Sequence, residues 1–152
     1  MIHWLPILLV SALLLTVSTS CTSKNKDGNV GLVDNLLLPC PSSPNCVCSE
    51  YSGASAWISP ITINGEQQQA WSAAIATVKE MGGKIIQEQD NYLHATFTSS
   101  IFRFVDDFEL RLDQAQSVIH LRSASRVGYS DLGVNRKRVE KFRTLFTAKL
   151  DK

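Results

Sequence analysis

The sequence predicts an α+β fold, in which a curved antiparallel sheet is covered on one face by two helices. Three neighbouring segments, residues 92–98, 102–112 and 117–125, alternate apolar and polar side chains, which is typical of half-buried strands. Two further segments, near 67–81 and 135–150, carry apolar side chains at helical spacing. A run of antiparallel strands with helices before and after it favours the α+β class.

The composition agrees with one globular domain. The chain has 152 residues, of which 44% are hydrophobic and 19% charged, and its net charge is +1. That length suits a single domain, and the apolar fraction is too high for a disordered chain. Proteins held to nucleic acid by bulk charge usually show a strong basic excess, so we expect no nucleic-acid partner.

The first twenty residues are predicted to be a signal peptide. Residues 2–17 are almost entirely apolar, which suits its hydrophobic region, but they are fewer than the roughly 20 that a membrane-spanning helix needs. The small residues at 18–20 precede Cys21, as in a bacterial lipobox, where the cysteine thiol takes a diacylglycerol. Ser18 stands where lipoboxes usually carry Leu, so simple secretion and an uncleaved anchor stay open.

We therefore expect a signal peptide at 1–20, a lipid-anchored flexible tether at 21–35 and a single α+β domain at 36–152. The tether is polar and contains glycine, which favours flexibility. The predicted location is the periplasmic face of the cell envelope. Thr22 follows the cysteine where inner-membrane retention would call for Asp, so the outer membrane is favoured.

The remaining cysteines lie close together in a proline-rich segment. An exported protein meets an oxidising compartment, so we expect a disulfide between Cys40 and Cys46, with Cys40–Cys48 as the alternative. A zinc site would lack a fourth ligand nearby. A redox-active pair is disfavoured because no helix start follows to lower a thiol pKa.

The first strand is expected at 56–63, where Pro60 suggests the edge of the sheet. The first helix follows directly, because Asn64 can cap it and Gln67 stands three residues later, as in a capping box. The glycine pair at 82–83 ends it. Apolar residues mark its buried stripe at i, i+4 and i+7: Trp71, Ile75 and Val78.

Four strands are expected next, at 84–89, 92–98, 102–112 and 117–125. The last helix begins near Asn135, and the Val134–Val139 spacing fits a hydrophobic staple. The order β-α-β-β-β-β-α is that of one TATA-binding-protein-like unit, which implies nothing about function. One face of the strand expected at 102–112 should lie under the helices, with Asp106 beside its apolar residues: Phe102, Phe104, Phe108, Leu110 and Leu112.

The opposite face of the sheet is expected to be open and polar. A turn at 113–116 would place Glu109 opposite His120 and Asp107 opposite Arg122. The interpretations are a solvated ion-paired surface, an anion or headgroup site, and a metal or acid–base site. The residues of this face are His94, Thr96, Arg103, Asp107, Glu109, Arg111, His120 and Arg122.

A basic segment joins the last strand to the last helix. Residues 121–143 hold seven Lys+Arg and two Asp+Glu, a net charge of +5. Three of these cations, at 136–138, occupy the first helical turn, although a helix N-terminus prefers anions. Either an internal carboxylate, Asp131 or Asp107, or a bound anion must compensate. The candidate ligand-binding residues are Arg122, Ser123, Ser125, Arg126, Tyr129, Asp131, Asn135, Arg136 and Arg138.

Support for catalysis is thin. The chain has no Gly-x-Ser-x-Gly elbow and no phosphate-binding glycine loop. We therefore assign no catalytic residue, metal or cofactor. The alternative function is a metal-dependent or acid–base hydrolase that uses His94, Asp107, Glu109 and His120.

Four stretches of the chain closely resemble the domain of unknown function family 1499: CPSSPNC at 40–46, YLHATF at 92–97, FVDD at 104–107 and RSASRVGYSDLGVNRKRVE at 122–140. The resemblance covers roughly Leu38 to Phe146. The family occurs among exported bacterial proteins and in photosynthetic lineages. Its activity is uncharacterised, so the resemblance implies no catalytic residues. Many members look like lipoproteins or membrane-attached proteins, which supports the interpretation of Cys21. Cys48 stands where the family more often has Ser, which favours the Cys40–Cys46 pairing.

The prediction is a small envelope lipoprotein that acts as a non-enzymatic binding or assembly module. Its partners would be the membrane, through the lipid anchor, and an anionic small molecule, lipid headgroup or envelope protein. Recognition would use the arginine-rich loop and the start of the last helix.

Overall fold

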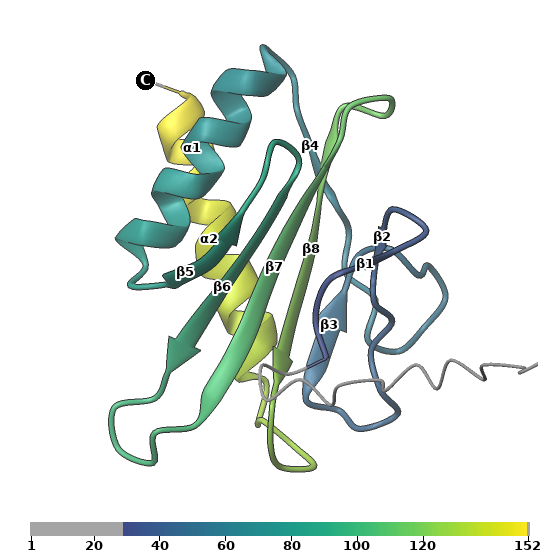
Figure 1. Ribbon diagram of the computed structural model, residues 1–152, viewed down its shortest axis with the longest axis vertical. Helices are drawn as coiled ribbons and strands as arrows, with labels where there is room; N and C mark the ends of the chain where they lie inside the picture. The colour runs from purple at the N-terminus through teal and green to yellow at the C-terminus, as the bar shows by residue number, and fades with distance from the viewer. Residues whose placement is uncertain (1–28, 152) are drawn as a thin grey trace, which may run out of the picture.

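The computed structural model describes residues 29–151 and confirms the α+β class, with two helices and a mostly antiparallel curved sheet (Figure 1). The predicted signal peptide, Cys21 and residues 22–28 lie outside the described residues. The strands and helices are β1 (Leu32–Val33), β2 (Leu36–Leu37), β3 (Cys46–Cys48), β4 (Ile61–Thr62), α1 (Gln67–Glu80), β5 (Lys84–Glu88), β6 (Tyr92–Thr98), β7 (Val105–Asp113), β8 (Val118–Ser125) and α2 (Val134–Leu150).

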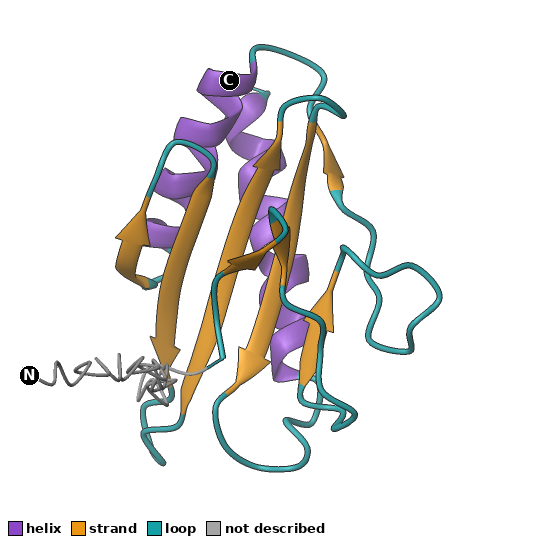
Figure 2. Cartoon of the chain, turned by 45° about the vertical axis from the view of Figure 1, so that its right-hand side comes forward, coloured by secondary structure: helices purple, strands orange, loops and turns teal. Residues whose placement is uncertain are grey.

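The main sheet has the strand order β3-β8-β7-β6-β5, and every neighbouring pair is antiparallel. β4 pairs with the other end of β8, so β3 and β4 share that edge. Both helices lie behind one face of the sheet, and the small β1–β2 hairpin lies in front of the other (Figure 2). The sheet is therefore covered on both sides.

The hydrophobic core lies between the sheet and the helices. α1 contributes Trp71 and Val78, and α2 contributes Phe142 and Phe146, all of them buried. Phe142 packs on Phe108 of β7, with ring centroids 5.4 Å apart. The alternating apolar residues of β6, β7 and β8 supply the floor of this core: Leu93, Ala95, Phe108, Leu110, Leu112, Ile119 and Leu121.

Both ends of α1 are capped by hydrogen bonds to its free backbone groups. At its C-terminal end, the Gly83 N–H donates to the carbonyl of Val78 and the Gly82 N–H to that of Lys79, and Gly82 has a φ of 85°. These bonds satisfy carbonyls that the helix leaves free. At its start, the Glu66 carboxylate accepts from the Gln68 N–H, so Glu66, rather than the predicted Asn64, caps the helix.

Three other predicted boundaries differ from the structure. The strand expected at 56–63 is reduced to an isolated bridge at Trp57 and to β4, because Pro60 lacks a donor for the ladder between them. β7 begins at Val105, so Phe102 and Phe104 lie in a loop and are exposed instead of facing the helices. α2 has Gly133 as its cap and begins at Val134, two residues too early for the predicted staple.

The N-terminal part of the fold covers the polar face of the sheet. β1 lies within the segment that was predicted to be a flexible tether. This stretch is ordered against β7, because the Gly31 N–H donates to the Glu109 carboxylate at 2.8 Å. Leu37 packs with Cys48 and Tyr92 in a second, smaller hydrophobic cluster. The folded region therefore begins before residue 36.

Cys40 and Cys46 form a disulfide, which closes the loop before β3. Cys48 is a free and buried thiol. Within residues 29–151, neither helix combines the length and apolarity needed to cross a bilayer.

We predict that Cys48 does not react with thiol reagents in the folded protein. Burial raises the pKa of its thiol to about 11, and the thiolate is the reactive form. In a Cys21→Ser chain, a thiol reagent should label one cysteine, and only once denaturant is added. Peptide mapping should place the label on Cys48. A label on Cys46 would mean that the bridge is Cys40–Cys48, and fast labelling without denaturant would contradict the burial.

Candidate functional site

The polar face of the sheet is a buried layer of charge and not the open surface that the alternation predicts. A cover made by residues 29–40 and 49–51 lies on it, so its ionisable side chains are out of contact with solvent. Burial of charge is tolerated when each group is paired and hydrogen-bonded. The buried residues of this face are His94, Thr96, Asp107, Glu109, Arg111, His120 and Arg122.

The register between β7 and β8 sets the pairs. Glu109 lies opposite Arg122, and Arg111 lies opposite His120. The predicted pairs are therefore wrong by two residues. The turn has the expected length but lies one residue later than predicted, since Asp113 still pairs with Val118, and Ser117 in the turn has a φ of 53°.

Glu109 is the centre of the first cluster. Its side chain is fully buried, and Oε2 accepts from Arg122 Nη1 at 2.7 Å. Oε1 accepts from the Tyr92 hydroxyl at 2.8 Å and from the Gly31 N–H at 2.8 Å. Burial and the neighbouring carboxylate raise the pKa of Tyr92, which keeps the hydroxyl a donor. This one carboxylate joins β6, β7, β8 and the N-terminal cover.

A second cluster surrounds Arg111. The guanidinium donates to both carboxylate oxygens of Glu50, at 2.7 and 3.2 Å, and is also paired with Asp113. His120 Nδ1 lies 3.0 Å from the Ser49 hydroxyl. Burial lowers the pKa of His120 below its ordinary value, although Glu50 opposes the shift. Glu50 and Ser49, which the sequence analysis did not select, anchor the cover to the sheet here.

The third cluster is built on Asp107. Its carboxylate lies 2.8 Å from His94 Nε2 and accepts from Arg126 Nε and Nη2. Burial alone would raise the pKa of Asp107, but the hydrogen bonds from His94 and Arg126 hold it below its ordinary value. Asp107 is therefore ionised and already satisfied.

The four residues of the alternative hydrolase site, which are His94, Asp107, Glu109 and His120, do not come together in one place. Only His94 and Asp107 touch, while Glu109 is bonded to Arg122 and His120 to Ser49. In the part of the chain that the structure describes, no three His, Cys, Asp or Glu side chains are grouped to hold a metal ion.

The basic segment after β8 supplies a further network. Arg138 Nη2 donates to Asp106 at 2.6 Å, which explains how this aspartate is tolerated beside the core. Arg138 Nη1 also donates to Asn135 Oδ1, and Asn135 donates in turn to the Asn45 carbonyl at 2.9 Å. Ser123 and Ser125 bond the same asparagine. Many of the candidate binding residues thus join β8, α2 and the disulfide loop.

Asp131 provides the negative group that the start of α2 requires. Its carboxylate accepts from the N–H groups of Gly133 and Asn135, at 3.0 and 2.7 Å. Burial would raise the pKa of Asp131, but these backbone donors lower it. The carboxylate is ionised and offsets the unfavourable placement of cations at the helix start.

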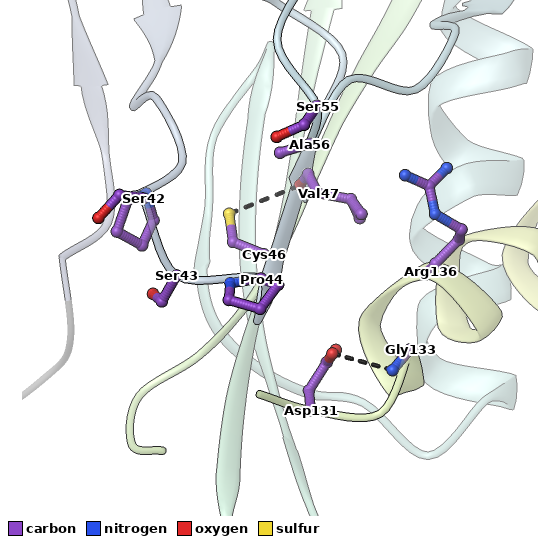
Figure 3. A pocket seen from close by; sticks show the side chains of 11 residues that line it. Ser42, Ser43, Pro44, Cys46, Val47, Ser55, Ala56, Asp131, Gly133 and Arg136 are labelled. Carbon is purple, nitrogen blue, oxygen red and sulfur yellow. Dashed lines mark hydrogen bonds between the residues drawn. The ribbon is translucent and has the colours of Figure 1, made fainter. Parts of the chain in front are cut away.

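Arg136 differs from Arg122, Arg126 and Arg138 because it is exposed and makes no ion pair with any residue between 29 and 151. It stands at the wall of a cleft of about 310 Å³ between the disulfide loop and the start of α2 (Figure 3). The far wall comes from 41–44 and from Ser55 and Ala56. Asp131, the cleft's one carboxylate, is committed to the helix cap.

The sequence analysis selected Arg136 but not the serine- and proline-rich wall that faces it. That wall is distant in sequence, and only its position inside the Cys40–Cys46 loop hinted at a fixed shape. A second cleft of about 530 Å³ lies on the other side of the disulfide loop and is lined by Arg122 and Arg126. Tyr129 lines neither cleft.

The comparison with known families gives one match. The model of a family described as "Protein of unknown function (DUF1499)" matches residues 36–146. No curated protein matches the chain.

We predict that Glu109→Gln destabilises the fold severely. The change leaves the buried Arg122 guanidinium without its counter-charge, and breaking a buried pair from one side costs about 3–5 kcal/mol. The measurement is the free energy of unfolding in urea. Glu140→Gln is the control, because this glutamate is exposed and the change should stay within about 0.5 kcal/mol. Equal effects of the two variants would contradict a central role for the Glu109–Arg122 pair.

Proposed function

Because the chain belongs to the DUF1499 family, whose function is unknown, we propose a function from its own residues: a lipid-anchored binding module of the cell envelope. In this proposal the module holds an anionic group, a phosphate or a carboxylate, in the cleft beside Arg136. No reaction is part of the proposal.

Arg136 carries this proposal. Within the described residues, three other arginines of the basic segment are committed: Arg122 to Glu109, Arg126 to Asp107 and Arg138 to Asp106. Arg136 has the same charge but no carboxylate partner there, and it borders a cleft large enough for a small headgroup. A guanidinium beside a helix start suits the recognition of phosphate or carboxylate.

The walls of the cleft support a site of fixed shape. The disulfide holds the loop on one side, and the Asn45 side chain donates to the Gly128 carbonyl at 2.6 Å. Asn135 ties the start of α2 to the same loop. A site that is ordered before binding loses less entropy when the ligand arrives.

The envelope location rests on the sequence alone. The apolar segment at 2–17 and the small residues before Cys21 support export and lipidation. The disulfide agrees with an oxidising compartment.

We predict that one anion stabilises residues 22–152 and that Arg136→Ala removes the effect. The measurement is thermal unfolding at low salt with phosphate, phospholipid headgroups, peptidoglycan fragments and dicarboxylates. A ligand at 100 times its Kd stabilises by about 2.7 kcal/mol. Both Arg136→Ala and its control, Lys137→Ala, should leave the ligand-free stability within about 0.5 kcal/mol, because both side chains are exposed.

The control separates the cleft from general attraction. Lys137 carries the same charge on the next residue but does not line the cleft. Binding by the cleft requires that Lys137→Ala keep the stabilisation. Equal loss in both variants would reject the cleft as the site, and the absence of any stabilising anion would reject the binding function.

We also predict that Cys21→Ser moves the full chain from the membrane fraction to the soluble fraction, because the variant cannot take a diacylglycerol. Fractionation and labelling with a radioactive fatty acid are the measurements. Retention of the unlabelled variant in the membrane would mean that the uncleaved apolar segment is the anchor.

A further inference from the structure

One end of the molecule concentrates exposed apolar side chains. The β6–β7 loop and the β8–α2 loop both lie there, at the lower end in Figure 1. Among the described residues, seven of the twelve large hydrophobic side chains that are exposed belong to these two loops or to the first residue of α2. We call this surface the tip patch, and it consists of Ile101, Phe102, Phe104, Val127, Tyr129, Leu132 and Val134.

The two loops form one surface. Phe104, Val127 and Val134 line a common hollow of about 430 Å³. Phe102 stacks on Phe104 with ring centroids 5.6 Å apart. The Arg126 N–H donates to the Val105 carbonyl at 3.1 Å, which holds the loops side by side.

The residues of the tip patch are not explained by the fold itself. Leu132 is 87% exposed and has a φ of 52°, a left-handed conformation that disfavours a leucine. Ile101 is 80% exposed. A leucine that gains neither burial nor a favourable backbone points to a contact outside the domain, and contiguous exposed apolar surface marks protein or membrane interaction sites.

The charges beside the tip patch favour an anionic surface. Arg103, Arg136 and Lys137 are exposed at this end. Its carboxylates are committed internally, Asp106 to Arg138 and Asp131 to the cap of α2. The turn between β7 and β8, at the opposite end in Figure 1, is polar and carries no cation between 113 and 117.

The course of the chain would hold the predicted N-terminal anchor at the same end. Asn29, the first described residue, lines one cleft together with Arg126, Val127 and Gly128. Cys21 is only eight residues before Asn29, a reach of at most about 28 Å for an extended chain. An anchor at Cys21, or in the apolar segment before it, therefore keeps the tip patch near the bilayer surface.

From these observations we infer that the tip patch docks on the surface of an anionic lipid bilayer. The aromatic and aliphatic side chains enter the interface, while the three cations meet lipid phosphates. Docking fixes the orientation of the domain, with the sheet standing away from the membrane. The inference goes beyond the anion cleft, but it rests on the proposed function for the membrane attachment of the N-terminus and it also uses Arg136.

The test is carried out on the full chain, reconstituted in vesicles of phosphatidylcholine and phosphatidylglycerol with brominated acyl chains. A Trp4→Phe background removes the tryptophan of the N-terminal segment. Tyr129→Trp then places a probe in the tip patch, and Ala115→Trp places one at the opposite end, in the exposed β7–β8 turn. Trp57 and Trp71 give the same background in both variants.

Docking predicts that the brominated lipid removes most of the fluorescence added by Tyr129→Trp and little of that added by Ala115→Trp. Adding Ile101→Asp and Phe102→Asp should restore the Tyr129→Trp signal, and both positions are exposed loop residues whose change spares the core. Equal quenching at the two ends, or no quenching at either while the protein stays on the vesicles, would overturn docking. The second result would assign the tip patch to another protein. Failure to associate with vesicles would overturn the anchor as well.

Discussion

The buried pair between Glu109 and Arg122 is the interaction on which the arrangement of this domain depends. The carboxylate accepts from Arg122, from Tyr92 and from the backbone of Gly31. These partners belong to β8, to β6 and to the N-terminal cover. A charge in a fully buried position is tolerated only while its partners are present, so the same carboxylate fixes the register of three strands and the position of the cover.

The two faces of the sheet are therefore stabilised by different interactions, apolar packing on one and ion pairs with hydrogen bonds on the other. The face under the helices is apolar, and packing of Phe108, Phe142 and Phe146 dominates it. The face under residues 29–40 and 49–51 is held by ion pairs and hydrogen bonds that require defined geometry. Arg122 Nε, which is buried without a hydrogen-bond partner among the described residues, shows that this layer is not fully satisfied. Polar layers of this kind specify one arrangement more strictly than apolar contacts do.

The internal use of charge also determines what remains for function. Arg122, Arg126 and Arg138 are bound to aspartate or glutamate. What the described part of the domain presents outward at this end is Arg136 at a small cleft and an apolar tip with cations around it. Both surfaces adjoin the β8–α2 loop, which the disulfide loop supports through Asn45 and Asn135. The proposed binding at the cleft and the proposed contact with a membrane would thus depend on the same loop and its supports.

The sequence alone determined the class of fold, because period-two and helical patterns fix which residues form strands and helices. It also identified the family, as the match over residues 36–146 confirms, and it selected Arg136 and its neighbours. Only the tertiary structure decided that the polar face is buried, since local alternation does not show what covers a sheet. It also decided the pairing of Glu109 with Arg122, which depends on a turn placed one residue later, and the exposure of Phe102 and Phe104, which hydrophobicity alone assigned to the core.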